Sequence, residues 1–257
     1  MSARSSMHGA SRGRAGLRVP VALTAPGLAT LSPEAVLYVT RVHRLGVGAS
    51  FVAFDPEKAV EADAEIVEVT RASAVARVGA IRPASVRPSR RVTLVQAAAK
   101  GEKMDGIIRD ATELGATRVI TVVTERSIAR PDVARVERWR RIAVEAARQC
   151  GRGDTPLIDT PSKLSVILPK LAPRAGEAAF CLDPWASAPL GAALSALSVE
   201  APVTFLIGPE GGFDEAEIQA SEDAGFTRVA LGALVLRTET VCPAVLGALL
   251  LGAPIAG

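Results

Sequence analysis

The length and composition of the chain allow a substantial hydrophobic core. With 257 residues, of which 49% are hydrophobic, it can form one large domain or two smaller ones. Aromatic residues make up only 4%, which argues against single-strand RNA recognition by many stacked aromatics. The formal net charge of +3, carried mostly by Arg, is compatible with nucleic-acid binding but equally with a metabolic enzyme.

Cysteine and histidine are too few and too scattered for a metal centre. Cys150, Cys181 and Cys242 have no ligand-like spacing, and His8 and His43 are the only histidines. We therefore expect no metal and no disulfide framework.

The two ends of the sequence contain no targeting or membrane-spanning pattern. Residues 1–16 mix Ser, Gly and Arg, so we expect a disordered tail and no signal peptide. The apolar stretch 244–257 is too short to span a bilayer. The expected location is the cytoplasm, with no membrane partner.

The first region, residues 17–82, has the pattern of a small β-barrel. Short β-prone runs are separated by turn signals such as Asp55-Pro56, and they occur at 35–42, 50–54, 64–69 and 74–78. Several short strands at this spacing suggest a barrel. Residues 83–90, with Pro83 and Pro88, are predicted to be a linker.

The second region, residues 91–257, alternates strands and helices. A strand at 92–95, a helix at 105–114 and a strand at 119–123 form a βαβ unit, which implies a parallel sheet. A long helix is expected at 132–149, with Val136, Trp139, Ala143 and Ala146 facing inward. Further strands are expected at 178–182, 203–207 and 227–231.

A glycine-rich loop follows one of the expected strands. The buried run ends at Ile207, residues 208–212 read Gly-Pro-Glu-Gly-Gly, and Asp214 with Glu217 can form a capping box for a following helix. Glycines there let backbone amides approach a ligand closely. Alone the loop is weak evidence, since a tight turn explains it as well, and it lacks the Lys-Ser/Thr pair of a P-loop.

A second strand-to-helix loop, residues 231–240, reads Leu-Gly-Ala-Leu-Val-Leu-Arg-Thr-Glu-Thr. Thr238 or Thr240 can cap the last helix, which would place Pro243 in its first turn. The polar run from Arg237 to Thr240 between two apolar segments exceeds what capping needs, so a functional role is favoured.

The two loops resemble the signature loops of the RsmE family, the 16S ribosomal RNA uridine-N3 methyltransferases of the knotted SPOUT class. Four further segments match in the same order: KGEKMD at 100–105, ATELG at 111–115, TERS at 124–127 and EAARQCGR at 145–152. The similarity extends from about Val19 to the end. Two departures are Val241 to Pro243 after the second loop, where a small residue is usual, and His43, where the family usually has a packing leucine.

The resemblance implies a PUA-like barrel that helps to hold RNA, an α/β domain with a C-terminal trefoil knot, and a homodimer. It also implies S-adenosylmethionine as cofactor, and 16S ribosomal RNA or the assembled small subunit as partner. The expected cofactor-binding residues are Leu182, Asp183, Pro184, Gly208, Pro209, Glu210, Gly211, Gly212, Leu231, Gly232, Leu236, Arg237, Thr238 and Thr240. The expected RNA-binding residues are Arg44, Lys100, Lys103, Arg148, Gln149 and Arg152.

Chemically, methylation of uracil N3 requires alignment of the methyl donor and removal of the imide proton. A nearby Arg would favour the uracil anion by lowering its pKa, and Arg126 is the first candidate and Arg237 the second. Glu239 could accept the proton or position the cofactor, and the sequence does not separate these roles.

Other functions remain open at the level of sequence. The nearest is another SPOUT methyltransferase, which acts on ribose 2′-hydroxyls or on tRNA. A second is a non-catalytic RNA-binding ribosome assembly factor with a relic cavity. A metabolic nucleotide-binding enzyme is disfavoured, because the phosphate-loop lysine is missing.

Overall fold

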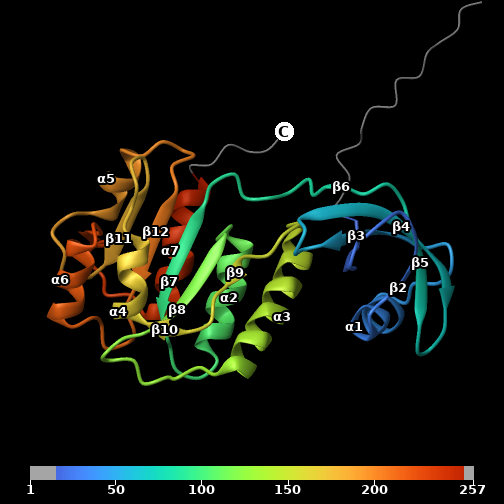
Figure 1. Ribbon diagram of the computed structural model, residues 1–257, viewed down its shortest axis with the longest axis horizontal. Helices are drawn as coiled ribbons and strands as arrows, with labels where there is room; N and C mark the ends of the chain where they lie inside the picture. The colour runs from blue at the N-terminus through green and yellow to red at the C-terminus, as the bar shows by residue number, and fades with distance from the viewer. Residues whose placement is uncertain (1–15, 252–257) are drawn as a thin grey trace, which may run out of the picture. The chain divides into compact units, whose positions relative to one another are not determined.

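The computed structural model describes residues 16–251, which divide into two compact units (Figure 1). Among the described residues, the first unit comprises 16–55 together with Val60–Pro83. The second comprises Pro56–Ala59 and the chain from Ala84 onward. Most of the predicted tail, residues 1–15, lies outside the described residues, as do residues 252–257.

The first unit is built on one mixed sheet with the order β1-β3-β4-β5-β2. Its strands are β1 (Arg18–Pro20), β2 (Gly27–Thr30), β3 (Ser50–Asp55), β4 (Val60–Val69), β5 (Ala74–Val78) and β6 (Arg82–Pro83), the last paired with β4. β1 and β3 are parallel, and the other pairs are antiparallel. Alternate strand residues such as Phe51, Ala64 and Ile66 are buried in its core.

One predicted strand of this unit is a helix. Residues 35–42, expected to be a strand, belong to α1 (Pro33–Leu37) and the π-helical segment η1 (Tyr38–Val42). The Ser32 hydroxyl accepts a hydrogen bond from the Ala35 amide, and Pro33 occupies the first turn. These start signals outweigh the β propensity of the valines, because Ala35, Val36 and Val39 recur at helical spacing and are all buried.

The second unit contains a parallel sheet with the order β10-β8-β7-β12-β11-β13, and β9 lies beside β8. All its pairings are parallel, as the βαβ pattern predicts. Its strands are β7 (Val92–Ala97), β8 (Arg118–Val123), β9 (Leu157–Ile158), β10 (Ser162–Lys163), β11 (Ala178–Leu182), β12 (Val203–Ile207) and β13 (Thr227–Val229).

Helices cover both faces of this sheet (Figure 1). One face packs against α2 (Lys103–Glu113), α3 (Val133–Cys150), α5 (Leu190–Ser195) and α7 (Thr238–Leu251). The other packs against α4 (Leu164–Ile167), the 3-10 turn η2 (Leu168–Leu171) and α6 (Glu215–Asp223). The central strands β7, β8, β11 and β12 are nearly continuous apolar runs because both of their faces are buried.

The ends of α3 and α6 follow the sequence signals. The Asp132 carboxylate caps α3, and Val136, Trp139, Ala143 and Ala146 are buried, as predicted. At α6, the Asp214 side chain accepts from the Glu217 amide at 2.7 Å, while Glu217 accepts from the Asp214 amide at 3.1 Å. This is the predicted capping box.

The start of α7 differs from the prediction. The helix already includes Thr238, so Pro243 lies inside it, beyond the first turn. Because proline has no N–H, one backbone hydrogen bond of the helix is missing there. Neither threonine is the N-cap of the helix. Thr240 lies within the helix, and the Thr238 hydroxyl bonds to the Gly208 carbonyl instead.

Most of the predicted linker, from Ala84 onward, belongs to the second unit, while Pro83 ends β6 of the first. The Gly153 amide donates to the Val86 carbonyl at 2.9 Å, and a Cβ on Gly153 would lie 2.1 Å from that of Ala84. Only glycine therefore allows this close approach.

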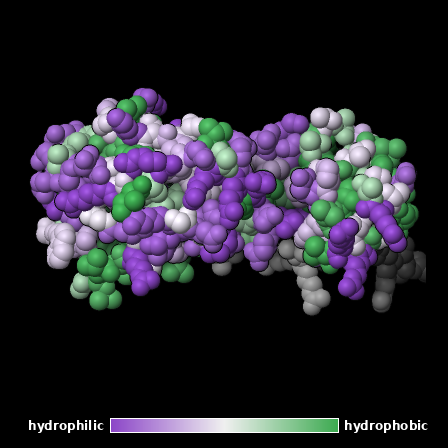
Figure 2. Space-filling model, turned by 90° about the horizontal axis from the view of Figure 1, so that it is seen from below, coloured by the Kyte–Doolittle hydropathy of each residue, from purple (hydrophilic) through white to green (hydrophobic). Residues whose placement is uncertain are grey.

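The described surface is mixed in character. Figure 2 shows a face on which hydrophilic side chains predominate and hydrophobic groups form separate patches. No helix within residues 16–251 is long and apolar enough to cross a membrane. In the same part of the chain, no three His, Cys, Asp or Glu residues are grouped so that they could hold a metal ion.

Candidate cofactor cavity

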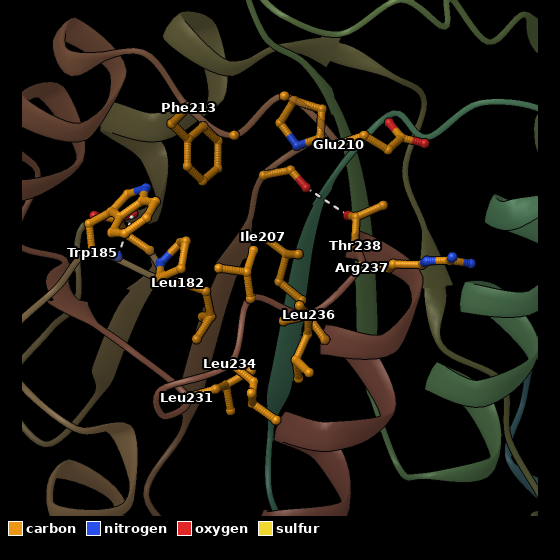
Figure 3. Close-up of a pocket in the computed structure, with 18 of the residues that line it drawn as sticks. Leu182, Trp185, Ile207, Glu210, Phe213, Leu231, Leu234, Leu236, Arg237 and Thr238 are labelled. Carbon is orange, nitrogen blue, oxygen red and sulfur yellow. Dashed lines mark hydrogen bonds between the residues drawn. The ribbon is translucent and has the colours of Figure 1, made fainter.

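A cavity of about 520 Å³ lies at the carboxyl ends of β11 and β12. Three loops enclose it: one follows β11, one follows β12, and one leads from β13 into α7 (Figure 3). Ligands of open α/β sheets bind at this edge. Its lining residues are Lys103, Leu182, Asp183, Pro184, Trp185, Ile207, Gly208, Pro209, Glu210, Gly211, Gly212, Phe213, Leu231, Leu234, Val235, Leu236, Arg237, Thr238 and Val241.

The loop after β12 folds back on itself and is supported from behind. A Cβ on Gly208 would lie only 3.2 Å from the Phe213 ring, and Gly212 has φ of +69°. The backbone of Gly212 favours glycine, and a side chain at Gly208 would require the Phe213 ring to move. Arg126 donates through Nη1 to the Gly211 and Phe213 carbonyls at 3.0 and 3.2 Å, which fixes the loop's course.

The loop before α7 is tied to the loop after β12 by a buried hydrogen-bond chain. Gln96, on β7, donates through Nε2 to the Thr238 hydroxyl at 3.0 Å. That hydroxyl donates to the Gly208 carbonyl at 2.7 Å, the bond dashed in Figure 3. Since Gln96 and Thr238 are both buried, the two walls are held together without competition from water.

The loop after β11 is fixed by a nearly buried carboxylate. Asp183 accepts from Arg228 at 2.5 Å and from the Trp185 amide at 3.2 Å. The hydrogen bond that Arg228 donates to Asp183 raises the pKa of Arg228. This anchor leaves Trp185 at the rim of the cavity with 80% of its surface exposed.

A lysine joins two carboxylates beside the cavity. Lys103 Nζ, at the start of α2, lies 2.9 Å from Glu210 Oε1 and 3.2 Å from Glu239 Oε2. The hydrogen bond to Glu210 is the largest cause of the raised pKa of Lys103. Partial burial works to raise the pKa of Glu210, but the hydrogen bonds that it accepts outweigh this and lower it.

Most of the predicted cofactor-binding residues line this one cavity. The exceptions are Gly232, in the loop before α7, and Thr240, in the first turn of α7, which are not among the lining residues. The sequence prediction missed Trp185, Ile207, Phe213, Leu234, Val235 and Val241. These apolar residues have no sequence signal that separates them from core residues.

The three proposed catalytic residues surround the cavity in different ways. Arg237 lines it, but its side chain extends away from the apolar group of Leu182, Ile207 and Leu236 (Figure 3). Arg126 stands behind the loop that it supports. Glu239 lies next to the cavity and is paired with Lys103.

The predicted RNA-binding residues differ in their exposure to solvent. Arg44, in the first unit, and Lys100 and Gln149, in the second, are exposed, and Arg148 is half-buried near the end of α3. Arg152 is only 3% exposed and donates through Nη1 to the Thr112 and Ala116 carbonyls at 2.9 and 2.8 Å. It also pairs with Asp154 at 2.7 Å. The guanidinium is therefore enclosed by internal partners, and its predicted RNA contact stays a prediction that this geometry does not support.

Sequence comparisons identify relatives for this chain. A model of the RNA methyltransferase domain matches residues 86–250. Proteins named ribosomal RNA small subunit methyltransferase E are similar: that of Synechocystis is 38% identical over 149 residues, and that of Aquifex aeolicus is 32% identical over 167. These matches cover 58% and 63% of this chain, and 49% and 69% of the relatives. The match thus spans only about half of the Synechocystis protein.

Two solved structures are similar over nearly the whole chain. One is a ribosomal RNA small subunit methyltransferase E from Neisseria gonorrhoeae bound to S-adenosylmethionine, with 26% identity and a TM-score of 0.82. The other is a Legionella pneumophila protein in complex with the same cofactor, with 28% identity and a TM-score of 0.82. Each match covers 93% of this chain and 98% of the other. The second unit accordingly has an α/β fold of the SPOUT type.

Proposed function

The chain belongs to the RNA methyltransferase domain family, among the ribosomal RNA small subunit methyltransferases E. On this premise we propose that it methylates N3 of a specific uridine in 16S ribosomal RNA. The proposed methyl donor is S-adenosylmethionine. The observation that carries the proposal is the single cavity formed by both loops that the sequence marks as functional.

The cavity fits the proposed cofactor in size and in character. Cavities for ligands of this size occupy about 300–1,000 Å³ and are mostly apolar, with a few polar groups that fix orientation. Here Leu182, Ile207 and Leu236 form an apolar wall, and loops rich in glycine bring backbone groups to its edge. When bound, S-adenosylmethionine supplies an activated methyl group on a sulfonium.

The chain's own task is to orient the uracil and to stabilise its N3 anion. Arg237 suits this task best, because it lines the cavity and its guanidinium has no hydrogen bond or ion pair among residues 16–251. A cation beside the base lowers the pKa of its imide and favours loss of the proton. Arg126 keeps Nε and Nη2 for a second contact while Nη1 supports the loop.

Glu239 is proposed as the residue that accepts the proton or positions the cofactor. Its carboxylate lies beside the cavity, 3.2 Å from the Lys103 ammonium. The target base must leave its stack for N3 to reach the cavity.

RNA binding is proposed to involve both units. Arg44, in residues 17–82, would contact phosphates from a PUA-like barrel, while Lys100, Arg148 and Gln149 would do so from residues 91–257. Residues 83–90 would join the two. A trefoil knot around the cavity loops, a homodimer and a cytoplasmic location complete the proposal, supported by the family to which the chain belongs.

Two measurements test the proposed function. Isothermal titration with S-adenosylmethionine should give a saturable heat of binding, which a relic cavity would not. Mapping of modified bases in ribosomal RNA from cells that lack the protein should reveal one missing N3-methyluridine in 16S RNA. Loss of a ribose methylation or a tRNA modification instead would refute the assignment.

A further inference from the structure

Lys103 occupies a position that an RNA-contacting lysine would not need. Its ammonium lies between carboxylates from two separate segments: Glu210 in the loop after β12 and Glu239 in the first turn of α7. One of its three N–H donors is thereby used in the hydrogen bond to Glu210, and the ammonium as a whole faces Glu239. Its side chain is only 35% exposed.

Neither carboxylate has another cation within 4 Å among the described residues. Glu239 Oε2 is buried and makes no hydrogen bond in this part of the chain, so its contact with Lys103 is electrostatic. Glu210 also accepts a long hydrogen bond, 3.4 Å, from the Lys100 amide. Without the ammonium, two negative charges would face each other at close range, one of them partly desolvated, which is unfavourable.

Both carboxylates belong to segments that shape the cavity. Glu210 lies among the glycines of the first loop, and Glu239 follows Thr238, whose hydroxyl already bonds to Gly208. The Lys103 bridge is therefore a second tie between the same two walls, on the solvent side of the buried Gln96–Thr238–Gly208 chain.

We infer that Lys103 is a positioning residue of the cofactor cavity: it holds the loop after β12 against the start of α7 by neutralising Glu210 and Glu239. The inference rests on the proposed function only in that the cavity binds S-adenosylmethionine. It replaces the RNA contact expected from the sequence.

Lys100 provides a matched control. It lies three residues away, it is exposed, and its side chain forms no ion pair among residues 16–251. Lys103→Met and Lys100→Met remove the same charge from the same segment, but only the first breaks the bridge.

The first arm of the test needs no ligand. Amide hydrogen exchange in the full-length chain should become several-fold faster at residues 208–213 and 238–242 in Lys103→Met, and should be unchanged in Lys100→Met. Equal exchange in both variants would refute the bridge.

The second arm measures affinity. Calorimetry should show S-adenosylmethionine binding to Lys103→Met roughly tenfold more weakly, the effect of two partly exposed ion pairs. Lys100→Met should bind like the wild type. Affinity for a 16S RNA fragment should stay within about twofold of the wild type in Lys103→Met. A variant that keeps cofactor affinity but loses RNA affinity would overturn the inference.

A double variant separates loss of positioning from general damage. Lys103→Met with Glu239→Gln removes the uncompensated charge, so exchange protection at residues 208–213 and 238–242, measured without ligand, should partly recover. No recovery would contradict the electrostatic basis. If the wild type itself gave no heat with S-adenosylmethionine, the proposed function would fail, while the exchange arm would still decide the role of Lys103.

Discussion

At the residue scale, Arg152 illustrates what sequence cannot distinguish. It lies in the segment EAARQCGR, which resembles a family motif, and it follows a helix rich in Arg, so it looks like part of an RNA-binding surface. In the structure its guanidinium closes a contact between α2, the turn before β8 and Asp154. An arginine at a surface and one inside have the same sequence signal, and only the three-dimensional partners separate them.

The first prediction concerns this residue. Arg152→Ala removes one donor from the buried Thr112 and Ala116 carbonyls and leaves the Asp154 carboxylate without its ion pair, so the free energy of unfolding should fall by about 3 kcal/mol. Urea denaturation followed by circular dichroism measures this. Under conditions where the variant is folded, RNA affinity should be unchanged; a variant of normal stability with weakened RNA binding would restore the original prediction.

The second prediction concerns cysteine reactivity. Burial raises the pKa of Cys181 to about 11 and that of Cys242 to about 12, so both thiols stay protonated near neutral pH. Cys150 is exposed. Because the thiolate is the reactive form, iodoacetamide at about pH 8 should label only Cys150 in the folded protein. Mass spectrometry should find one adduct, and three after denaturation.

The third prediction uses the exposed rim of the cavity. The chain has two tryptophans: Trp139, fully buried in the core, and Trp185, which lines the cavity and is 80% exposed. A ligand in the cavity should cover Trp185 alone, so S-adenosylmethionine should shift tryptophan emission to shorter wavelength. In Trp185→Phe the shift should vanish while calorimetric binding remains. A shift that persists would place the ligand elsewhere.

At the element scale, start signals and amphipathic spacing were the most informative features. The capping box at Asp214 and the apolar face of α3 were predicted and are confirmed. The prediction of a strand at 35–42 is wrong, because the valines there favour a strand while Ser32 and Pro33, just before them, start a helix. The predicted start of α7 lies too far along the chain for a similar reason. Thr238 has the sequence signal of an N-cap, but its hydroxyl bonds to the distant Gly208 carbonyl.

The fourth prediction concerns the capping box of α6. Asp214 and Glu217 secure the helix that follows the cavity loop, and Glu217 also accepts from the Glu125 amide at 2.9 Å. Asp214→Ala should lower the free energy of unfolding by about 1 kcal/mol, the usual effect of losing an N-cap. Asp214→Asn keeps the acceptor and should remain near wild-type stability in the same denaturation experiment. Equal losses would show that charge, not capping, matters.

At the scale of the whole molecule, the sequence predicted the type of sheet and its covering helices better than the order of the strands within the sheet. Alternating strands and helices implied a parallel sheet, and the pairings of the second unit are all parallel. The order could not be predicted, because β12 pairs with β7, more than a hundred residues earlier in the chain. The cavity depends on that pairing, since it brings Gln96 to Thr238 and thereby joins its two loops. Long-range pairing leaves no local trace in the sequence.

The fifth prediction tests whether the first unit contributes to RNA binding while the second alone binds the cofactor, as proposed. Arg44 is an exposed residue of the first unit with a left-handed backbone, φ of 53°, which Asn tolerates well. Arg44→Asn should therefore keep the backbone while it removes one phosphate contact. The slope of log affinity for a 16S RNA fragment against log salt concentration should become shallower by about one. Arg44→Lys keeps the charge and should retain the slope, and calorimetric binding of S-adenosylmethionine should be unchanged in both variants, because the cavity lies in the second unit. An unchanged slope in Arg44→Asn would exclude this residue from the RNA interface, and a loss of cofactor binding would show that the units do not act separately.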